Sequence, residues 1–286
     1  MPEAFVTLFD RNYVHHGLAL YRSLVRHFNG AFRLYVICMD GQAFQAIGQL
    51  DLDNFIPIAL ADLETEELKI AKASRTRGEY CWTLTPFTFD FVFDRDIQIR
   101  QVTYLDSDLW LRDSCNEIFT EFSDSTKQVL ITKHAYHPDY DQTETSGKFC
   151  VQFLTFKRHG SIAVRRRWQQ QCLDWCYSHS EDGKFGDQKY LDEWPRLFPE
   201  LVHVLKAESL VMGPWNAKRF PYSDAAAWHF HGVRIRLDPS GAPFAAMSNF
   251  YEIPQPTKNY VYNPYVAEIL GCYQFFQANF PGIYGN

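Results

Sequence analysis

The sequence predicts an α/β protein with a mostly parallel central sheet flanked by helices. In about the first hundred residues, short runs rich in β-branched and aromatic residues alternate with segments whose apolar residues recur at helical spacing. This alternation is typical of βαβ units, in which a crossover helix connects two parallel strands. The chain has 286 residues, 46% of them hydrophobic, so it can bury a large core.

The elements in the first part of the chain follow this alternation in order. The strands are expected at 4–9, 33–40, 55–60 and 101–111, and the helices at 17–28, 43–50 and 78–93. The helix at 78–93 contains Pro86 and many β-branched and aromatic residues. We still expect a helix there, because the strand that follows needs a crossover.

The second half of the chain has more widely spaced elements. Strands are expected at 128–134 and 148–158, a helix at 161–178, and a loop leading into a short helix at 185–198. The Pro-rich stretch YEIPQPTKNYVYNP then marks a boundary. We therefore expect a single domain at 1–250 and, at 251–286, an aromatic-rich C-terminal extension packed on it.

Composition argues against several classes of protein. The net charge of −6 argues against nucleic-acid binding, and Arg165, Arg166 and Arg167 are interpreted as a solvated helix face. The seven cysteines lack paired metal-binding spacing and indicate reduced thiols in the cytoplasm. From the residues at the start of the sequence we expect no signal peptide, and the sequence contains no 18-residue apolar run. The oligomeric state and a peripheral membrane contact through the aromatic tail stay open.

Two aspartates stand close together in the stretch VTYLDSDLWL. Residues two apart in a strand face the same side, so Asp106 and Asp108 project together while Ser107 points away. If the strand ends near Leu105, both carboxylates emerge at the carboxyl edge of the sheet, where open α/β sheets bind ligands. The two charges repel each other, and Mg²⁺ or Mn²⁺ would relieve the repulsion. The alternative is a turn or a helix cap, where aspartate and serine are common.

A third candidate metal ligand occurs in AWHFHGVRI. His229 and His231 share one face of the strand expected there, and a neutral imidazole can complete the coordination of Mg²⁺ or Mn²⁺. The alternative is a histidine whose hydrogen bonds are satisfied in the core or at a sheet edge.

Five segments in order resemble the metal-dependent glycosyltransferases of the GT-A fold, in particular the glycogenin-like and bacterial lipopolysaccharide galactosyltransferase group of glycosyltransferase family 8. They are VTLFDRNYVHHGLALYRSL, YCWTLT, YLDSDLWL, GDQKYL and HFHG, and the similarity covers about residues 4 to 236. The resemblance implies a Rossmann-like nucleotide-diphospho-sugar transferase fold, with residues 1–250 as the catalytic domain and a nucleotide sugar as donor.

The resemblance also implies roles for single residues. The implied metal ligands are Asp106, Asp108 and His229. The residues implied around the nucleotide sugar are Thr7, Leu8 and Phe9 at the base, Tyr13 stacked on the base, Asp106 near the ribose, and Ser107 as a further binding residue. The residues implied beside the transferred sugar are Asp187 and Gln188.

Contacts to the donor sugar depart from the group's pattern. Gln152, in FCVQF, stands where the group has an Asn-Ser-Gly turn, so we expect Gln152 to contact the donor sugar. Trp215 and Asn216, in LVMGPWNAKRF, have two interpretations. They present an aromatic face and an amide to a sugar, or they are a buried ring and a helix-capping residue.

The basic residues of the group are also displaced. The basic residue before YCWTLT is out of register, so Arg75 or Arg77 is expected to replace it. After Gly232, Arg234 or Arg236 takes the place of the group's lysine. An arginine there can bind a diphosphate through two parallel hydrogen bonds.

These assignments predict a hexosyltransferase that moves a sugar from a UDP-linked donor to a hydroxyl group of a glycan, a lipid-linked acceptor or a protein. A metal ion with an arginine would stabilise the departing diphosphate. The sugar passes through an oxocarbenium-like state, so a nearby carboxylate is useful, and we assign this role to Asp187. The resemblance implies retention of the anomeric configuration.

Three other functions are weighed against this one. A nucleotidyltransferase acting on sugar phosphates would need a Gly-rich, basic loop after the first strand, and FDRNYVHH has no glycine. A non-catalytic carbohydrate- or protein-binding module would not need Asp106, Asp108, Asp187 and His229 together. A calcium-binding structural domain is disfavoured because the DSD stretch lacks the ligand spacing of an EF-hand loop.

Overall fold

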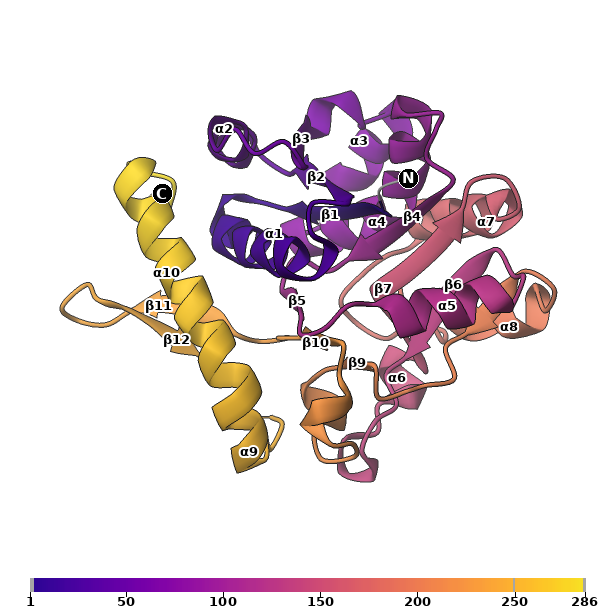
Figure 1. Ribbon diagram of the computed structural model, residues 1–286. Coiled ribbons are helices and arrows are strands. Elements are labelled where there is room, and N and C mark those ends of the chain that lie inside the picture. The colour runs from indigo at the N-terminus through magenta and orange to yellow at the C-terminus, as the bar shows by residue number, and fades with distance from the viewer. Residues whose placement is uncertain (1–2, 249, 285–286) are drawn as a thin grey trace.

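The computed structural model describes residues 3–248 and 250–284, so the last two residues of the predicted extension lie outside the described part. The strands of the central sheet are β1 (Glu3–Phe9), β2 (Phe32–Cys38), β3 (Phe55–Ala59), β4 (Gln101–Leu105), β6 (Val129–Lys133), β7 (Phe149–Lys157) and β8 (Val202–Val204). Their order is β3-β2-β1-β4-β7-β6-β8 (Figure 1). Strand β7 is antiparallel to both neighbours, and the other pairs are parallel. The predicted mostly parallel sheet is confirmed.

Helices and two small sheets surround this centre. The helices are α1 (Val14–Phe28), α2 (Gly41–Gln49), α3 (Glu66–Ala73), α4 (Arg77–Arg95), α5 (Asn116–Asp124), α6 (Thr143–Ser146), α7 (Ile162–Asp174), α8 (Trp194–Leu197), α9 (Gln255–Thr257) and α10 (Asn263–Asn279). The first small sheet consists of β5 (Leu109–Leu111), β10 (Ala227–His229) and β9 (Val211–Met212), and the second of β11 (Arg234–Leu237) and β12 (Pro243–Ala246).

The central sheet separates two hydrophobic cores. Alternate side chains of β1 point to opposite faces, so Phe5 and Phe9 belong to one core and Val6 and Leu8 to the other. Helices α1, α2 and α5 cover the first face, and α3, α4, α7 and α8 cover the second. The apolar residues from which the strands were predicted therefore fill both cores. Polar side chains are then expected where the strands end.

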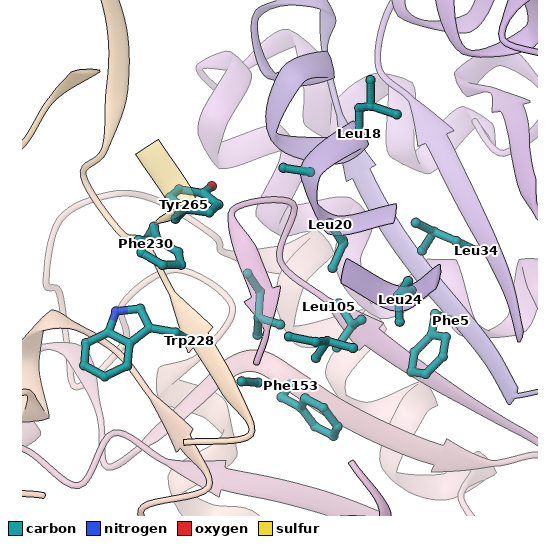
Figure 2. Close-up of a cluster of buried hydrophobic side chains, with 14 of the residues drawn as sticks. Phe5, Leu18, Leu20, Leu24, Leu34, Leu105, Phe153, Trp228, Phe230 and Tyr265 are labelled. Atoms are coloured by element: carbon teal, nitrogen blue, oxygen red, sulfur yellow. The ribbon is translucent and has the colours of Figure 1, made fainter. Parts of the chain in front are cut away.

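The long helix α10 packs across α1 and closes the first core (Figure 1). Its Tyr265 is fully buried and stacks on Phe230, with the ring centroids 3.5 Å apart (Figure 2). The hydroxyl group of Tyr265 also lies 2.6 Å from Nδ1 of His16 on α1. These contacts join His16, Phe230 and Tyr265, which lie far apart in the sequence. The division of the chain into a domain at 1–250 and an extension stays a prediction.

Several elements differ from those predicted. The strand expected at 101–111 is divided, because β4 ends at Leu105 and the chain turns before β5 joins a different sheet. The helix expected at 161–178 ends at Asp174. Helices α3, α5, α6, α9 and α10 and the short strands β8, β9, β11 and β12 were not predicted. Helix α4 does form and contains Pro86.

The interpretation of the arginine run as a solvated face is wrong for one of its three members. Arg165 is 4% exposed, and its guanidinium group pairs with Asp90 at 2.9 Å and covers the ring of Phe93 at 4.8 Å. Arg166 and Arg167 are exposed, as predicted. The ion pair and the aromatic contact offset the cost of burying this charge between α4 and α7.

Across residues 3–248 and 250–284, we find no helix that combines the length and the apolar character needed to cross a membrane.

The first turn of α4 is tied to the loop that follows α7 through one carboxylate. Glu79 accepts hydrogen bonds from the backbone nitrogen and hydroxyl group of Thr76, both at 2.8 Å, which forms a capping box. Its second oxygen accepts from the backbone nitrogen and hydroxyl group of Ser178 at 2.8 and 3.0 Å. Burial acts to raise the pKa of Glu79, but the hydrogen bonds from Ser178 and Thr76 prevail and lower it to about 2.

Replacing Glu79 by glutamine is expected to destabilise the fold by about 1–3 kcal/mol at neutral pH. The folded-state pKa of Glu79 lies below its ordinary value, so its contribution is present above about pH 4.5 and is lost as the pH falls towards 2. Urea unfolding of both proteins between pH 7 and pH 3 measures this difference. The free-energy gap should shrink below pH 4.5, whereas Glu117→Gln, at an exposed site on α5, should change stability by less than about 0.5 kcal/mol. A gap that does not change with pH would contradict this account.

Candidate active site

A cavity of about 540 Å³ opens where β1 and β4 end. This is the carboxyl edge of the parallel part of the sheet, where open α/β sheets bind ligands. The ends of these strands, the start of α4 and the loop before Gln188 form one side of the cavity. The segment between β6 and β7, the short helix at Trp215 and the residue Tyr251 form the other side.

The DSD stretch forms a turn at the floor of this cavity. The backbone nitrogen of Asp106 donates to the carbonyl oxygen of Gln152 at 3.1 Å, and that of Leu109 donates to the carbonyl oxygen of Asp106 at 3.0 Å. Strand β5 then pairs with β10, which places His229 opposite Leu109. The two carboxylates emerge at the expected edge of the sheet, but the turn rather than strand alternation directs them.

The side chains of Asp106, Asp108 and His229 converge on one point. One ligand atom from each lies within 4.8 Å of the others. Nε2 of His229 is 3.0 Å from Oδ1 of Asp108 and 3.7 Å from Oδ2 of Asp106. Two carboxylates and one imidazole nitrogen in this space form a donor set that suits Mg²⁺ or Mn²⁺, with room in the cavity for phosphate oxygens.

Each member of this cluster is held by a further residue. The hydroxyl group of Tyr104 donates to Oδ1 of Asp106 at 3.0 Å. Oε1 of Gln152 lies 2.8 Å from Nδ1 of His229. An amide oxygen can only accept, so Nδ1 carries the hydrogen and Nε2 is available to a cation. This outer contact is the arrangement by which proteins orient a histidine that binds a metal.

The electrostatics of the cluster favour a cation. Burial raises the pKa of Asp106, and the charge of Asp108 raises it further. Burial acts in the same direction on Asp108, but His229 and Arg234 outweigh it and lower the pKa of Asp108. Burial acts to lower the pKa of His229, but Asp108 prevails and holds it well above its ordinary value. The carboxylates thus attract a proton onto the ring, and a divalent cation competes for the same position.

A cationic and aromatic wall lies beside Asp108. Nη1 of Arg234 is 3.8 Å from Oδ2 of Asp108, and its guanidinium group lies over the ring of Tyr13 at 4.9 Å. Further along, Nη1 of Arg77 is 2.6 Å from Oδ2 of Asp10, the residue that follows β1. This side of the cavity therefore combines an aromatic ring with two guanidinium groups, which suits a nucleotide with its phosphates.

Asp187 lines the cavity from the loop before Gln188. It follows Gly186, whose positive φ of 51° brings the chain against the ring of Trp82. The carbonyl oxygen of Asp187 accepts a hydrogen bond from Nε1 of Trp168 at 2.8 Å. Burial, and then the charge of Asp106, raise the pKa of Asp187 well above its ordinary value. The neighbouring Gln188 donates through Nε2 to the carbonyl oxygen of Ser146 at 2.7 Å.

The cavity brings together most of the residues predicted from the sequence. Those that line it are Leu8, Phe9, Tyr13, Arg77, Asp106, Ser107, Asp108, Asp187, Gln188, Trp215, His229 and Arg234. The alternatives to Arg77 and Arg234 do not line the cavity. Arg75 donates to the carbonyl oxygen of Leu173, and Arg236 is exposed on β11. The roles of the lining residues stay predictions.

Four predicted residues do not line the cavity. Thr7 is fully buried within β1, and the amide of Gln152 points at His229. Asn216 is fully buried and bonds the backbone of Gly213 and His134, which is the capping arrangement. Gly232 has a positive φ of 82° and makes the turn after β10. Of these four residues, Gln152 contacts His229 and Asn216 bonds His134, so both support lining residues from behind.

The expectation that His229 and His231 share a strand face is wrong. Strand β10 ends at His229, and His231 lies in the following turn with an exposed side chain. Both line the cavity, but the described residues place only His229 within the carboxylate cluster.

The sequence-based assignment missed several lining residues. Those with polar or aromatic side chains include Asp10, Trp82, Tyr104, His134, Tyr136, Gln142 and Tyr251. Asp10 directly follows β1, so its place at the strand end was a usable signal. The others come from helix α4, the strand β4 and connecting segments, where no local pattern indicates a direction.

Two known proteins resemble the chain in sequence. No family model matches the sequence. Two proteins of Bacillus subtilis (strain 168), YfnF and YfnD, both described as uncharacterized, are each 26% identical to the chain. YfnF covers 82% of the chain with 83% of its own length, and YfnD covers 97% with 92%.

Two solved structures are similar at lower identity. Mouse xyloside xylosyltransferase 1 has a TM-score of 0.53 at 17% identity and covers 81% of the chain with 98% of its own. The galactosyltransferase LgtC, solved with donor and acceptor sugar analogs, has a TM-score of 0.51 at 14% identity and covers 94% with 95% of its own. The chain therefore has the GT-A fold of these glycosyltransferases.

We expect His229, and not His231, to be a metal ligand. His229→Ala should reduce Mn²⁺ affinity by about tenfold or more, because the outer partners of metal ligands alone contribute that much. His231→Ala is the matched control and should stay within about twofold to threefold of the wild type. Titration of Mn²⁺ alone, followed by electron paramagnetic resonance, compares the two. A larger loss for His231→Ala would show that the ligand has been assigned to the wrong histidine.

Proposed function

We propose that the protein is a metal-dependent glycosyltransferase that moves a sugar from a UDP-linked donor to a hydroxyl acceptor with retention of configuration. The observation that carries the proposal is the cluster of Asp106, Asp108 and His229 on the floor of a cavity at the carboxyl edge of a GT-A sheet. The glycosyltransferases LgtC and xyloside xylosyltransferase 1 share this fold and support the same reaction class. The resemblance to the glycogenin-like group belongs to the same proposal.

The donor nucleotide binds between the end of β1 and the DSD turn. Leu8 and Phe9 line the pocket for the base, and Tyr13 offers its ring for stacking. Arg234 neutralises the diphosphate and approaches it from the side of Tyr13. Asp106, Asp108 and His229 would hold Mn²⁺ or Mg²⁺, which when bound neutralises the phosphate oxygens and so stabilises the departing diphosphate.

The chain's own groups act on the sugar. Asp187 is buried beside Asp106 and, as a carboxylate, stabilises positive charge at the anomeric carbon as the bond to the diphosphate breaks. Gln188 and Ser146 close the wall next to it.

The proposal is tested by binding of nucleoside diphosphates. UDP, GDP and CDP are titrated into the protein by calorimetry with and without Mn²⁺, and UDP is expected to bind only with the metal. Asp108→Ala should abolish this metal-dependent binding, because it removes one charged ligand. Asp113→Ala, at an exposed aspartate after β5, is the matched control and should bind as the wild type does. Undiminished UDP affinity in Asp108→Ala would overturn the metal assignment.

Asp187→Asn is expected to lower turnover by about a hundredfold or more, the usual scale for losing a positioned charged group. UDP affinity in the presence of Mn²⁺ should stay close to that of the wild type, because Asp187 lies at the sugar and not at the nucleotide. Proton NMR of the first-formed product reports both turnover and anomeric configuration. Near-normal turnover would remove Asp187 from the chemistry, and a product of inverted configuration would exclude retention.

A further inference from the structure

Part of the cavity lining differs in character from the donor end and from the cluster of Asp106, Asp108 and His229. The rings of Tyr136, Trp215 and Tyr251 line this part of the cavity, and we call this part the aromatic chamber. The polar groups among these rings come from His134, Gln142, Ser146 and His231. Except for Trp215, which was weighed as a sugar contact, none of these residues was predicted from the sequence to contact the donor.

A chain of contacts connects the chamber to the nucleotide end through the cluster of Asp106, Asp108 and His229. Tyr13 contacts Arg234, which lies beside Asp108, and Asp108 in turn lies 3.0 Å from His229. The ring of His229 then meets that of Trp215 edge-on, with the centroids 5.4 Å apart. A molecule in the chamber would thus face the donor sugar across the cluster. The bond between Gln188 and Ser146 also joins the chamber to the loop that carries Asp187.

The aromatic chamber and the rest of the cavity lining differ in charge. All the charged lining residues, Asp10, Arg77, Asp106, Asp108, Asp187 and Arg234, belong to the donor end, the cluster or the loop at Asp187. Among the described residues, those of the chamber include no lysine, arginine, aspartate or glutamate. Burial lowers the pKa of His134 to about 3, so its ring is neutral at pH 7. A charged ligand would have no counter-ion in the chamber.

Aromatic faces with neutral polar groups between them fit the ring of a sugar. The C–H bonds on one face of a pyranose pack against the negative face of an aromatic ring. Its hydroxyl groups need donors and acceptors around the edge, which an amide, an imidazole and a serine supply. An extended lipid chain would not use these polar groups.

We propose that the aromatic chamber is the acceptor subsite and that it takes an uncharged pyranose ring. The inference rests on the proposed function, and it selects a glycan among the acceptors that function leaves open. The sugar in the chamber presents one hydroxyl group across His229 to the donor sugar.

Tyr251 is the residue through which the chamber can be tested. It comes from the segment after β12 and is held by Gln142, whose Nε2 donates to its hydroxyl group at 3.0 Å. The next residue, Glu252, donates from its backbone nitrogen to the hydroxyl group of Tyr140 at 2.8 Å. The carboxylate of Glu252 pairs with Nζ of Lys218 at 3.0 Å. Lys218 also pairs with Asp139 at 3.0 Å. Tyr251 is only partly buried, so its replacement leaves both cores intact.

The experiment measures binding of methyl β-D-galactopyranoside and methyl α-D-glucopyranoside by saturation-transfer NMR, with UDP and Mn²⁺ present. At least one of these neutral glycosides should bind the wild type, and methyl β-D-glucuronide should not. Tyr251→Ala should weaken binding by about tenfold, whereas Tyr251→Phe, which keeps the ring, should stay within about threefold. Tyr260→Ala, at an aromatic residue 62% exposed outside the cavity, is the matched control and should bind as the wild type does.

The outcomes separate the inference from the proposed function. If UDP and Mn²⁺ fail to bind the wild type, the proposed function fails. If UDP binds and no neutral glycoside does, or the glucuronide binds better, the inference fails while the function stands. Equal glycoside affinity in Tyr251→Ala and the wild type also overturns the inference. Unchanged UDP affinity in that variant shows that the donor site and the fold are intact.

Discussion

The repulsion between Asp106 and Asp108 is the constraint on which the rest of the site depends. Two partly desolvated carboxylates at the edge of a sheet are unfavourable unless positive charge lies between them. Two side chains supply this positive charge. Nε2 of His229 lies 3.0 Å from Oδ1 of Asp108, and Nη1 of Arg234 lies 3.8 Å from Oδ2 of Asp108. Both groups come from the segment around β10, so a strand far away in the sequence has to reach the turn after β4. The small sheet of β5, β10 and β9 provides that connection, because β10 pairs with β5 directly after the turn.

Hydrophobic packing holds the connection in place. The backbone nitrogen of Phe230 donates to the carbonyl oxygen of Asp108 at 2.9 Å, and its ring stacks on Tyr265 of α10. Phe230 thus connects the turn that carries Asp108 to the first core and restrains the position of that turn. Gln152 does the same from β7, where the antiparallel strand brings its amide to His229. Rigid support of this kind keeps ligand atoms at fixed distances, which metal binding requires.

Local patterns were sufficient for the strands up to β4, for helices α1, α2 and α4, and for the convergence of the two aspartates. They could not show that Arg165 is buried, because its partner Asp90 belongs to a different helix. Strands β8 and β9 have three and two residues, too few for a period of two to be visible. The wall at Tyr251 depends on where a segment after β12 folds back, and no spacing in the sequence encodes that contact. The site was predictable where it lies on the sheet edge and unpredictable where connecting segments close over it.

The stacking of Phe230 on Tyr265 also bears on the order in which the protein assembles. Asp108 leaves the ribosome well before β10, and β10 before α10, while domains begin to fold during synthesis. The nascent sheet of β1 to β4 can therefore form with its acidic turn still uncovered. The turn gains its imidazole and its aromatic cover only when the later segments dock. Until then the sheet can be folded while the cluster of Asp106, Asp108 and His229 is incomplete, and a nascent chain that stalls before β10 would hold its two carboxylates in water without the imidazole.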